Sequence, residues 1–200
     1  MNGIKIWTVI ILTFIPFVLY SQAERWTYSY NGSADTTDEA NSIIYGEDGN
    51  LYIAGFSTET SNGSDFMVVS LTPNGVERWN YTYNGAADSS DGALSIVYGA
   101  DGNIYVAGGS TENGNSVDIT VISLTTSGNE RWVYKYNGAG NSVDIVNRIV
   151  YGEDGNLYAA GYSTGNGSGE DFAIISLTTN GYERWVYTYN GVENGDDELN

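Results

Sequence analysis

Aspartates that recur at a fixed spacing are the residues of this chain best suited to chemistry. They form two series whose members stand 53 residues apart, Asp38, Asp91, Asp144 and Asp197 in one and Asp65, Asp118 and Asp171 in the other. Clustered carboxylate oxygens suit a hard cation such as Ca²⁺, and we expect the two series to pair within a unit, as Asp38 with Asp65. The candidate metal ligands are therefore Asp38, Asp65, Asp91, Asp118, Asp144 and Asp171.

The same aspartates also have a structural interpretation. A carboxylate in a turn accepts hydrogen bonds from nearby backbone amides and so holds the turn in shape. No stretch matches a complete Asp-x-Asp-x-Asp-Gly calcium loop, and a copy in every unit is typical of a structural residue. The sequence favours this loop-capping role over metal binding.

Histidine and cysteine are both absent from the 200 residues. Their absence removes Ser-His relays, thiolate nucleophiles and the usual ligands of zinc and copper. Paired carboxylates could run hydrolysis, but each candidate lies in a turn or recurs at the fixed spacing, whereas active sites break such symmetry. We predict that the chain is not an enzyme and has no catalytic residue and no cofactor, with Ca²⁺ as the candidate ion.

Aromatic and cationic side chains recur together in the tripeptide Glu-Arg-Trp. The tripeptide supplies Arg25, Arg78, Arg131 and Arg184 and, after them, Trp26, Trp79, Trp132 and Trp185. A tryptophan can stack on a sugar ring, as in lectins, but the strand position of these residues favours packing between neighbouring units. The arginines are expected to pair with carboxylates at the edge of each unit.

The 53-residue spacing is constant throughout the chain, so each copy is expected to be one supersecondary unit that buries its apolar faces against its neighbours. A hydrophobic fraction of 41%, with 26 glycines and two prolines, fits a folded chain with many tight turns. The predicted units are 24–76, 77–129, 130–182 and a partial unit, 183–200.

Each unit contains four apolar or alternating runs separated by turn residues, and no long stretch has helical periodicity. Asp-Gly and Asn-Gly turns predict antiparallel hairpins, and the last run alternates aromatic with polar residues. We therefore predict an all-β fold, a β-propeller of four-stranded antiparallel blades. The first set of four runs is 42–46, 51–56, 66–71 and 76–83.

The combined pattern resembles the bacterial β-propeller repeat known as the SBBP repeat. The resemblance covers the chain after residue 23 and implies a secreted or surface propeller, mostly without an assigned activity. The Gly-x-Glu-Arg-Trp ending is also similar to the quinoprotein repeat, whose tryptophan docks between blades. The residues that carry the first resemblance include the strand Asp118 to Leu124, the turn at Gly128, the loop Asn137-Gly138 and the hairpin Asp154 to Tyr158.

Both ends of the chain carry further predictions. Residues 1–23 have Lys5, an apolar run and a small-x-small site, which are typical of a cleaved secretory signal peptide. The remaining residues, 24–200, give an outer strand, three complete blades and a loop. We expect an incomplete ring, truncated at its C-terminal end, whose open sheet faces promote self-association.

The charge of the chain narrows the class of partner. The formal net charge is −18, and losing Lys5 with the signal peptide leaves 25 acidic against six basic residues. Nucleic acid and membrane insertion are therefore not expected. We predict a non-catalytic secreted or cell-surface module that binds an unidentified protein or glycan or acts as a scaffold. The alternatives are a lectin-like sugar binder and a fragment of a quinoprotein-type or hydrolytic propeller enzyme.

Overall fold

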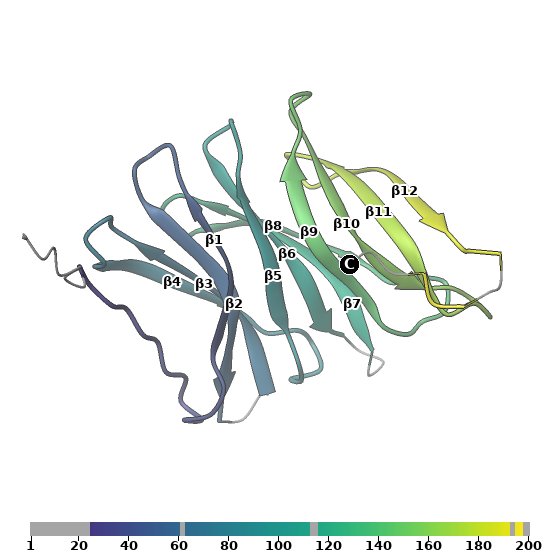
Figure 1. The fold of residues 1–200 in the computed structure, drawn as a ribbon, viewed down its shortest axis with the longest axis horizontal. Coiled ribbons are helices and arrows are strands. Elements are labelled where there is room, and N and C mark those ends of the chain that lie inside the picture. Colours follow the sequence, from purple (N-terminus) through teal and green to yellow (C-terminus); the bar gives the residue numbers. More distant parts are fainter. Residues whose placement is uncertain (1–24, 61–62, 113–115, 193–194, 198–200) are drawn as a thin grey trace, which may run out of the picture.

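The computed structural model describes residues 25–60, 63–112, 116–192 and 195–197. These residues form three four-stranded antiparallel sheets and contain no helix, hence none that could span a membrane. The sheets lie side by side in chain order (Figure 1). Their strands are β1 (Glu39–Tyr45), β2 (Leu51–Glu59), β3 (Gly63–Leu71) and β4 (Glu77–Tyr83), then β5 (Gly92–Tyr98), β6 (Asn103–Thr111), β7 (Val117–Thr125) and β8 (Glu130–Tyr136), then β9 (Asp144–Tyr151), β10 (Asn156–Thr164), β11 (Glu170–Thr178) and β12 (Glu183–Tyr189).

Short turns of fixed composition join the strands within each sheet. In the β5–β6 turn, Gly102 has a φ of 77°, a conformation that costs glycine little. The Asp101 carboxylate closes the turn by accepting the backbone N–H of Asn103 at 3.1 Å. The hairpins predicted from the Asp-Gly and Asn-Gly turns, and the all-β sheets built from them, are confirmed.

The sheets pack face to face around two hydrophobic cores. We call the face that carries the Trp-Tyr-Tyr series of the fourth strand the leading face, and the opposite face the trailing face. The leading face of the first sheet, with Tyr52, Phe66 and Val68, packs on Ile104 and Ile122 of the second. The leading face of the second sheet packs in the same way on the trailing face of the third.

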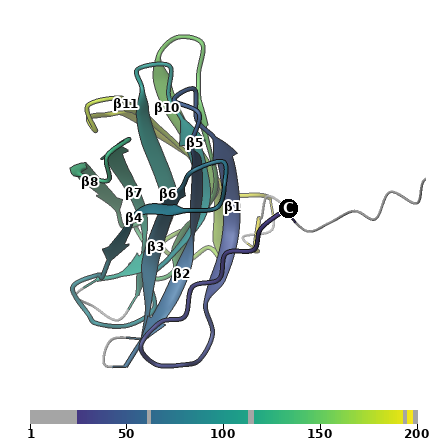
Figure 2. The same ribbon diagram turned by 90° about the vertical axis from the view of Figure 1, so that its left-hand side faces the viewer.

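The three first strands approach one another while the fourth strands diverge. Strand β5 packs against β1, β2 and β3, and β9 packs against β5, β6 and β7. Figure 2 shows β1 and β8 on opposite sides of the molecule. The sheets are therefore stacked as wedges rather than as parallel layers.

Two hydrogen bonds link the fourth strand of the first and of the second sheet to the sheet that follows, and we call this pair the latch. At the first junction, Trp79 Nε1 donates to the Thr126 carbonyl at 3.0 Å, and the Tyr81 hydroxyl donates to Glu130 at 2.6 Å. Burial, and then the Glu130 carboxylate, raise the pKa of Tyr81 far above its usual value, so its hydroxyl remains a donor. At the second junction, Trp132 bonds to Thr179 O and Tyr134 to Glu183 in the same way.

The N-terminal segment 25–30 makes the same latch contacts as a fourth strand but has no strand structure. Trp26 Nε1 donates to Pro73 O at 3.1 Å and Tyr28 donates to Glu77 at 2.5 Å, so a third latch holds the segment on the first sheet. The outer strand predicted here is wrong as regards secondary structure, because no third strand lies beside the segment among the described residues. The predicted signal peptide, 1–23, lies outside the described residues.

The latch generates a prediction with an internal control. Tyr134→Phe removes a hydroxyl that donates to a carboxylate, and it should lower the free energy of unfolding by about 1–1.5 kcal/mol. Tyr187→Phe, at the equivalent position of β12, removes a hydroxyl with no partner among the described residues and should cost much less. Urea denaturation of both variants measures the difference, and equal losses would show that the tyrosine bond of the latch contributes nothing to stability.

Candidate functional site

The first series of aspartates caps the loops that precede each sheet. Asp91 accepts the backbone N–H of Gly85 at 2.7 Å and that of Thr111 at 2.6 Å. Asp38 and Asp144 accept the equivalent pairs of amides. These bonds join the loop before each first strand to the end of the second strand, which is the loop-capping arrangement.

The second series, before each third strand, has a different environment. Asp65, Asp118 and Asp171 are each more than 90% buried, and the Oδ1 atom of each lacks a hydrogen-bond partner in the structure. Burial, followed by the neighbouring charges of Asp91, Glu59 and Asp88, raises the pKa of Asp65 to about 6.

The two series meet across the junctions between sheets. The charge with the greatest effect on Asp65 is Asp91 of the next sheet rather than Asp38 of its own, and Asp91 N donates to Ser64 O at 2.6 Å. Burial likewise raises the pKa of Asp118 to about 6, and Asp144 contributes the largest charge effect. The structure thus places Asp65 beside Asp91, and Asp118 beside Asp144, in contrast to the predicted pairing within a unit.

A buried carboxyl beside a second carboxylate can hold a proton near neutral pH, or it can share a cation. Within the part of the chain that the structure describes, no group of three or more acidic, histidine or cysteine side chains is placed to hold a metal ion. Holding a proton requires no ligand beyond the two carboxyl groups. Calcium binding stays a prediction.

The arginines lie in a recurring polar cluster between the second and third strands. Arg78 Nη1 donates to Ser70 Oγ at 2.8 Å and to the Tyr52 hydroxyl at 3.2 Å, while the Asp48 carboxylate lies 3.8 Å away. Asp48 accepts the Tyr52 hydroxyl at 2.5 Å. The cluster joins the first hairpin to the outer strand, which agrees with the edge pairing predicted for the arginines.

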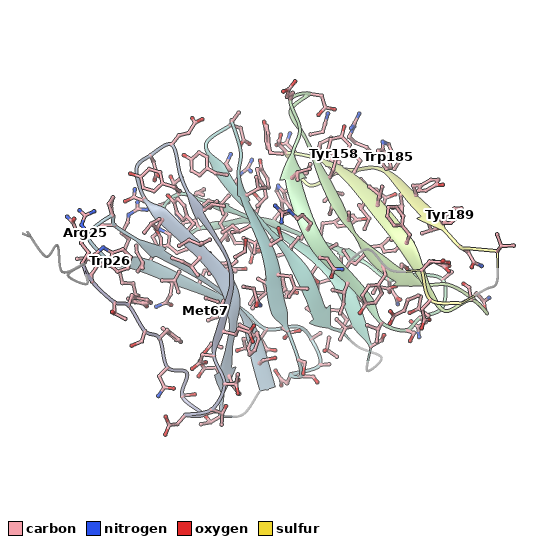
Figure 3. All side chains as sticks on the ribbon, in the orientation of Figure 1. Arg25, Trp26, Met67, Tyr158, Trp185 and Tyr189 are labelled. Atoms are coloured by element: carbon pink, nitrogen blue, oxygen red, sulfur yellow. The ribbon has the colours of Figure 1, made fainter. Side chains whose placement is uncertain are left out.

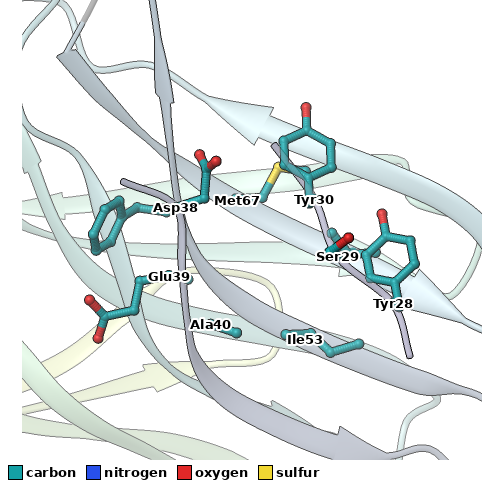
Figure 4. Close-up of a pocket in the computed structure, with 11 residues that line it drawn as sticks. Tyr28, Ser29, Tyr30, Asp38, Glu39, Ala40, Ile53 and Met67 are labelled. Carbon is teal, nitrogen blue, oxygen red and sulfur yellow. The ribbon is translucent and has the colours of Figure 1, made fainter. Parts of the chain in front are cut away.

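A hollow of about 300 Å³ lies between segment 25–30 and the first sheet (Figure 4). Tyr28 and Tyr30 line one side, Ile53 and Met67 line the floor, and Asp38 lies at the edge. Sequence reasoning did not identify this hollow. Its signal was the position of Tyr28, 49 residues before Glu77, since Tyr81 and Tyr134 precede their glutamates by the same interval.

The leading face of the third sheet forms the other exposed region. Trp185, Tyr187 and Tyr189 are 42%, 52% and 51% exposed, and a hollow beside the two tyrosines is lined by Phe172, Asp196 and Asp197. Figure 3 shows Trp26 and Trp185 at opposite ends of the molecule. Trp185 thus differs from Trp79 and Trp132, which are partly buried against the next sheet as the sequence predicts.

The buried carboxyls predict a loss of stability with rising pH. Their folded-state pKa, about 6, exceeds the unfolded value of 3.8, so their stabilising effect is complete below pH 3.8 and is lost as the pH rises through 6. Asp65→Asn should therefore raise the free energy of unfolding by about 2 kcal/mol more at pH 7.5 than at pH 4.5. Chemical denaturation at both pH values measures this, with the exposed Glu153→Gln as the control.

Calcium added to the same samples tests the cation prediction. Ligand that binds the folded state alone raises the melting temperature. A cation at the Asp65 and Asp91 pair should raise it in the parent chain at pH 7.5 and much less in Asp65→Asn. An equal response in both chains would place the ion elsewhere.

Comparison with known proteins assigns neither a family nor a function. No family model and no curated protein matches the chain. Among solved structures, it is similar to a protein of unknown function from Bacteroides caccae, with 16% identity and a TM-score of 0.46. The match covers 77% of this chain and 47% of that protein, so the chain spans about half of its length. A likeness this distant carries no argument about function.

Proposed function

We propose that the chain is a non-catalytic binding or scaffold module built as an arc of β-propeller blades, each of the three sheets being one blade. The wedge-like stacking supports this arrangement, because first strands that converge and fourth strands that diverge are what blades around a common axis require. The SBBP resemblance, with its secreted or surface location, belongs to the same proposal.

The use of the recurring polar residues supports a non-catalytic role. Trp79 and Trp132 form latches, Arg78 and Arg131 hold polar clusters, and Asp91 caps a loop. Most of the residue types that could do chemistry therefore have structural partners, the exceptions being the buried Oδ1 atoms of Asp65, Asp118 and Asp171. What remains exposed is a pair of end faces with apolar and aromatic character.

A single observation carries the proposal. The leading face is covered in the first two sheets, where Tyr52 and Tyr105 are fully buried, and it is open in the third, where Trp185 and Tyr187 are exposed. Exposed aromatic surface of this kind marks an interaction site. The end face of the third sheet is thus the binding surface that the geometry supports best.

A fourth sheet supplied in the same polypeptide tests this role. Asn200 aligns with Asn147, with the 53-residue spacing, so appending the sequence of residues 95–147 after Asn200 continues the pattern in register. We expect a higher melting temperature, because the added sheet buries Trp185 and Tyr187. The same fusion carrying Trp185→Ala and Tyr187→Phe is the control and should gain less. An equal gain in both fusions would count against the end face as a docking surface.

A sugar-binding role is the second candidate, and the hollow on β12 favours it. Tyr187 and Tyr189 lie there beside Asp196 and Asp197. Aromatic rings can stack on a sugar while carboxylates accept its hydroxyls. A glycan array with the parent chain and with Tyr189→Ala tests this candidate. Binding to a defined sugar that the substitution abolishes supports it, and an array without signal removes it.

A further inference from the structure

Each tryptophan of the latch occupies a cradle on the next sheet. The Trp79 ring lies against Gly128, where a Cβ atom would meet the ring at 2.7 Å, and its Nε1 atom bonds to a carbonyl of the same turn. Gly181 receives Trp132 and Gly75 receives Trp26 in the same way. The described residues therefore contain three cradles, and all three are occupied.

Trp185 is the fourth tryptophan of the series and has no cradle among the described residues. Its indole Nε1 and the Tyr187 hydroxyl lack the acceptors that their equivalents find on the next sheet. Tyr158, whose ring centroid lies 6.0 Å from that of Trp185 in a tilted arrangement, is also partly exposed, whereas Tyr52 and Tyr105 are fully buried. The chemistry of the missing partner is defined by the two complete junctions: a glycine turn with a free carbonyl, followed by a glutamate.

The trailing face of the first sheet has this chemistry and is only partly covered. It presents Gly75, the Pro73 carbonyl and Glu77. Ile43 on this face is 61% exposed, although its equivalent Ile96 is 4% exposed. Segment 25–30 packs Tyr28 and Tyr30 on this face against Met67, Val69 and Leu71, and hollows of about 300 and 330 Å³ remain beside the segment.

Contacts between tyrosine rings also indicate that the leading face of the third sheet and the trailing face of the first sheet are complementary. Tyr52 contacts Tyr98 of the next sheet at 6.1 Å, and Tyr105 contacts Tyr151 at the same distance. Tyr158 of the third sheet is equivalent to Tyr52 and Tyr105. Tyr45 of the first sheet is equivalent to Tyr98 and Tyr151. Tyr45 is 65% exposed, so each end of the molecule carries one unpaired half.

From these observations we infer that two copies of this chain associate head to tail, the leading face of the third sheet in one copy docking on the trailing face of the first sheet in the other. The inference rests on the proposed function, in which the end faces are binding surfaces, and it names the partner. Trp185 enters the Gly75 cradle and bonds to Pro73 O, and Tyr187 bonds to Glu77. The interface is heterologous, so the pair of copies keeps one free leading face and one free trailing face.

Segment 25–30 competes with the incoming copy for the same cradle. Trp185 and Tyr187 replace the latch bonds of Trp26 and Tyr28 one for one, so the exchange leaves the number of latch bonds unchanged. The gain comes from burying Tyr158 of one copy together with Ile43 and Tyr45 of the other, and it must exceed the packing of Tyr28 and Tyr30 that the exchange removes. A tethered competitor acts at millimolar effective concentration, so it weakens the association without preventing it.

The net charge of −18 opposes the contact between copies. Repulsion between distant charges is screened within about 8 Å at physiological salt, whereas the docking faces act in contact. The association should therefore strengthen as the salt concentration rises.

Complementary variants test the geometry directly. Tyr187→Glu places a second carboxylate opposite Glu77 and disables the leading face, while Ile43→Glu disables the trailing face. Analytical ultracentrifugation should show concentration-dependent oligomers for the parent chain and monomers for each variant alone. A mixture of the two variants should form dimers and stop there, because the one functional interface joins an intact face from each.

Thr188→Glu provides the matched control, because this exposed residue lies on the opposite side of β12, next to Tyr187. It should associate like the parent chain. Oligomers from Tyr187→Glu alone, or no dimer in the mixture, would overturn the head-to-tail geometry.

Substitutions of the equivalent residues Trp26 and Trp185 should shift the concentration for half-association in opposite directions. Trp26→Ala removes the tethered competitor and should lower the concentration for half-association at least about tenfold. Trp185→Ala removes the docking residue and should raise it. If both substitutions shift the association in the same direction, exchange of the segment is wrong.

The four-sheet fusion separates this inference from the proposed function. If the parent chain and Trp26→Ala both stay monomeric while the fusion is stabilised through Trp185, the end face is a docking surface but another copy is not its partner. If the fusion also gains nothing through Trp185, the proposed function fails as well.

Discussion

The hydrogen bond from a tryptophan indole to a carbonyl on the next sheet is the interaction on which the arrangement of this protein depends. Hydrogen bonding within a sheet fixes four strands but does not determine how one sheet lies on another. The apolar faces supply most of the attraction, which is not directional. The Nε1 bond from Trp79 to Thr126 O, with the ring against Gly128, fixes the register between the sheets. Tyr81 and Glu130 then fix it at a second point.

The loops at the junctions show the cost of packing sheets closely. Asp91 has two backbone amides to satisfy its carboxylate, but Asp65 is buried beside it with an Oδ1 atom that has no partner. Burial and the adjacent negative charge both favour the protonated form of Asp65. One carboxylate of each junction therefore orders a loop, while its neighbour responds to the pH of the solution.

Sequence reasoning succeeded where the controlling interactions are local. The Asp101-Gly102-Asn103 turn determines its own hairpin, and the alternation along β8 determines which side chains face the neighbouring sheet. Interactions between sheets were harder to predict, because Asp65 and Asp91 meet only after the sheets have packed. The strand predicted at the N-terminal end failed for a related reason. An outer strand exists only beside a third strand, and segment 25–30 has none among the described residues.

The junctions between the sheets are equivalent, so the sheet faces that form them differ little from one unit to the next. Any leading face fits any trailing face, since Trp79, Trp132 and Trp26 all enter the same kind of cradle. Specificity must therefore come from features that differ between copies of the unit. Segment 25–30 is one such feature, because it covers a trailing face without supplying the inner strands that would seal it. A separate factor is the net charge of −18, which adds repulsion to any contact between two chains. The balance between these two features and the open aromatic face sets whether the arc remains alone or accepts a further sheet.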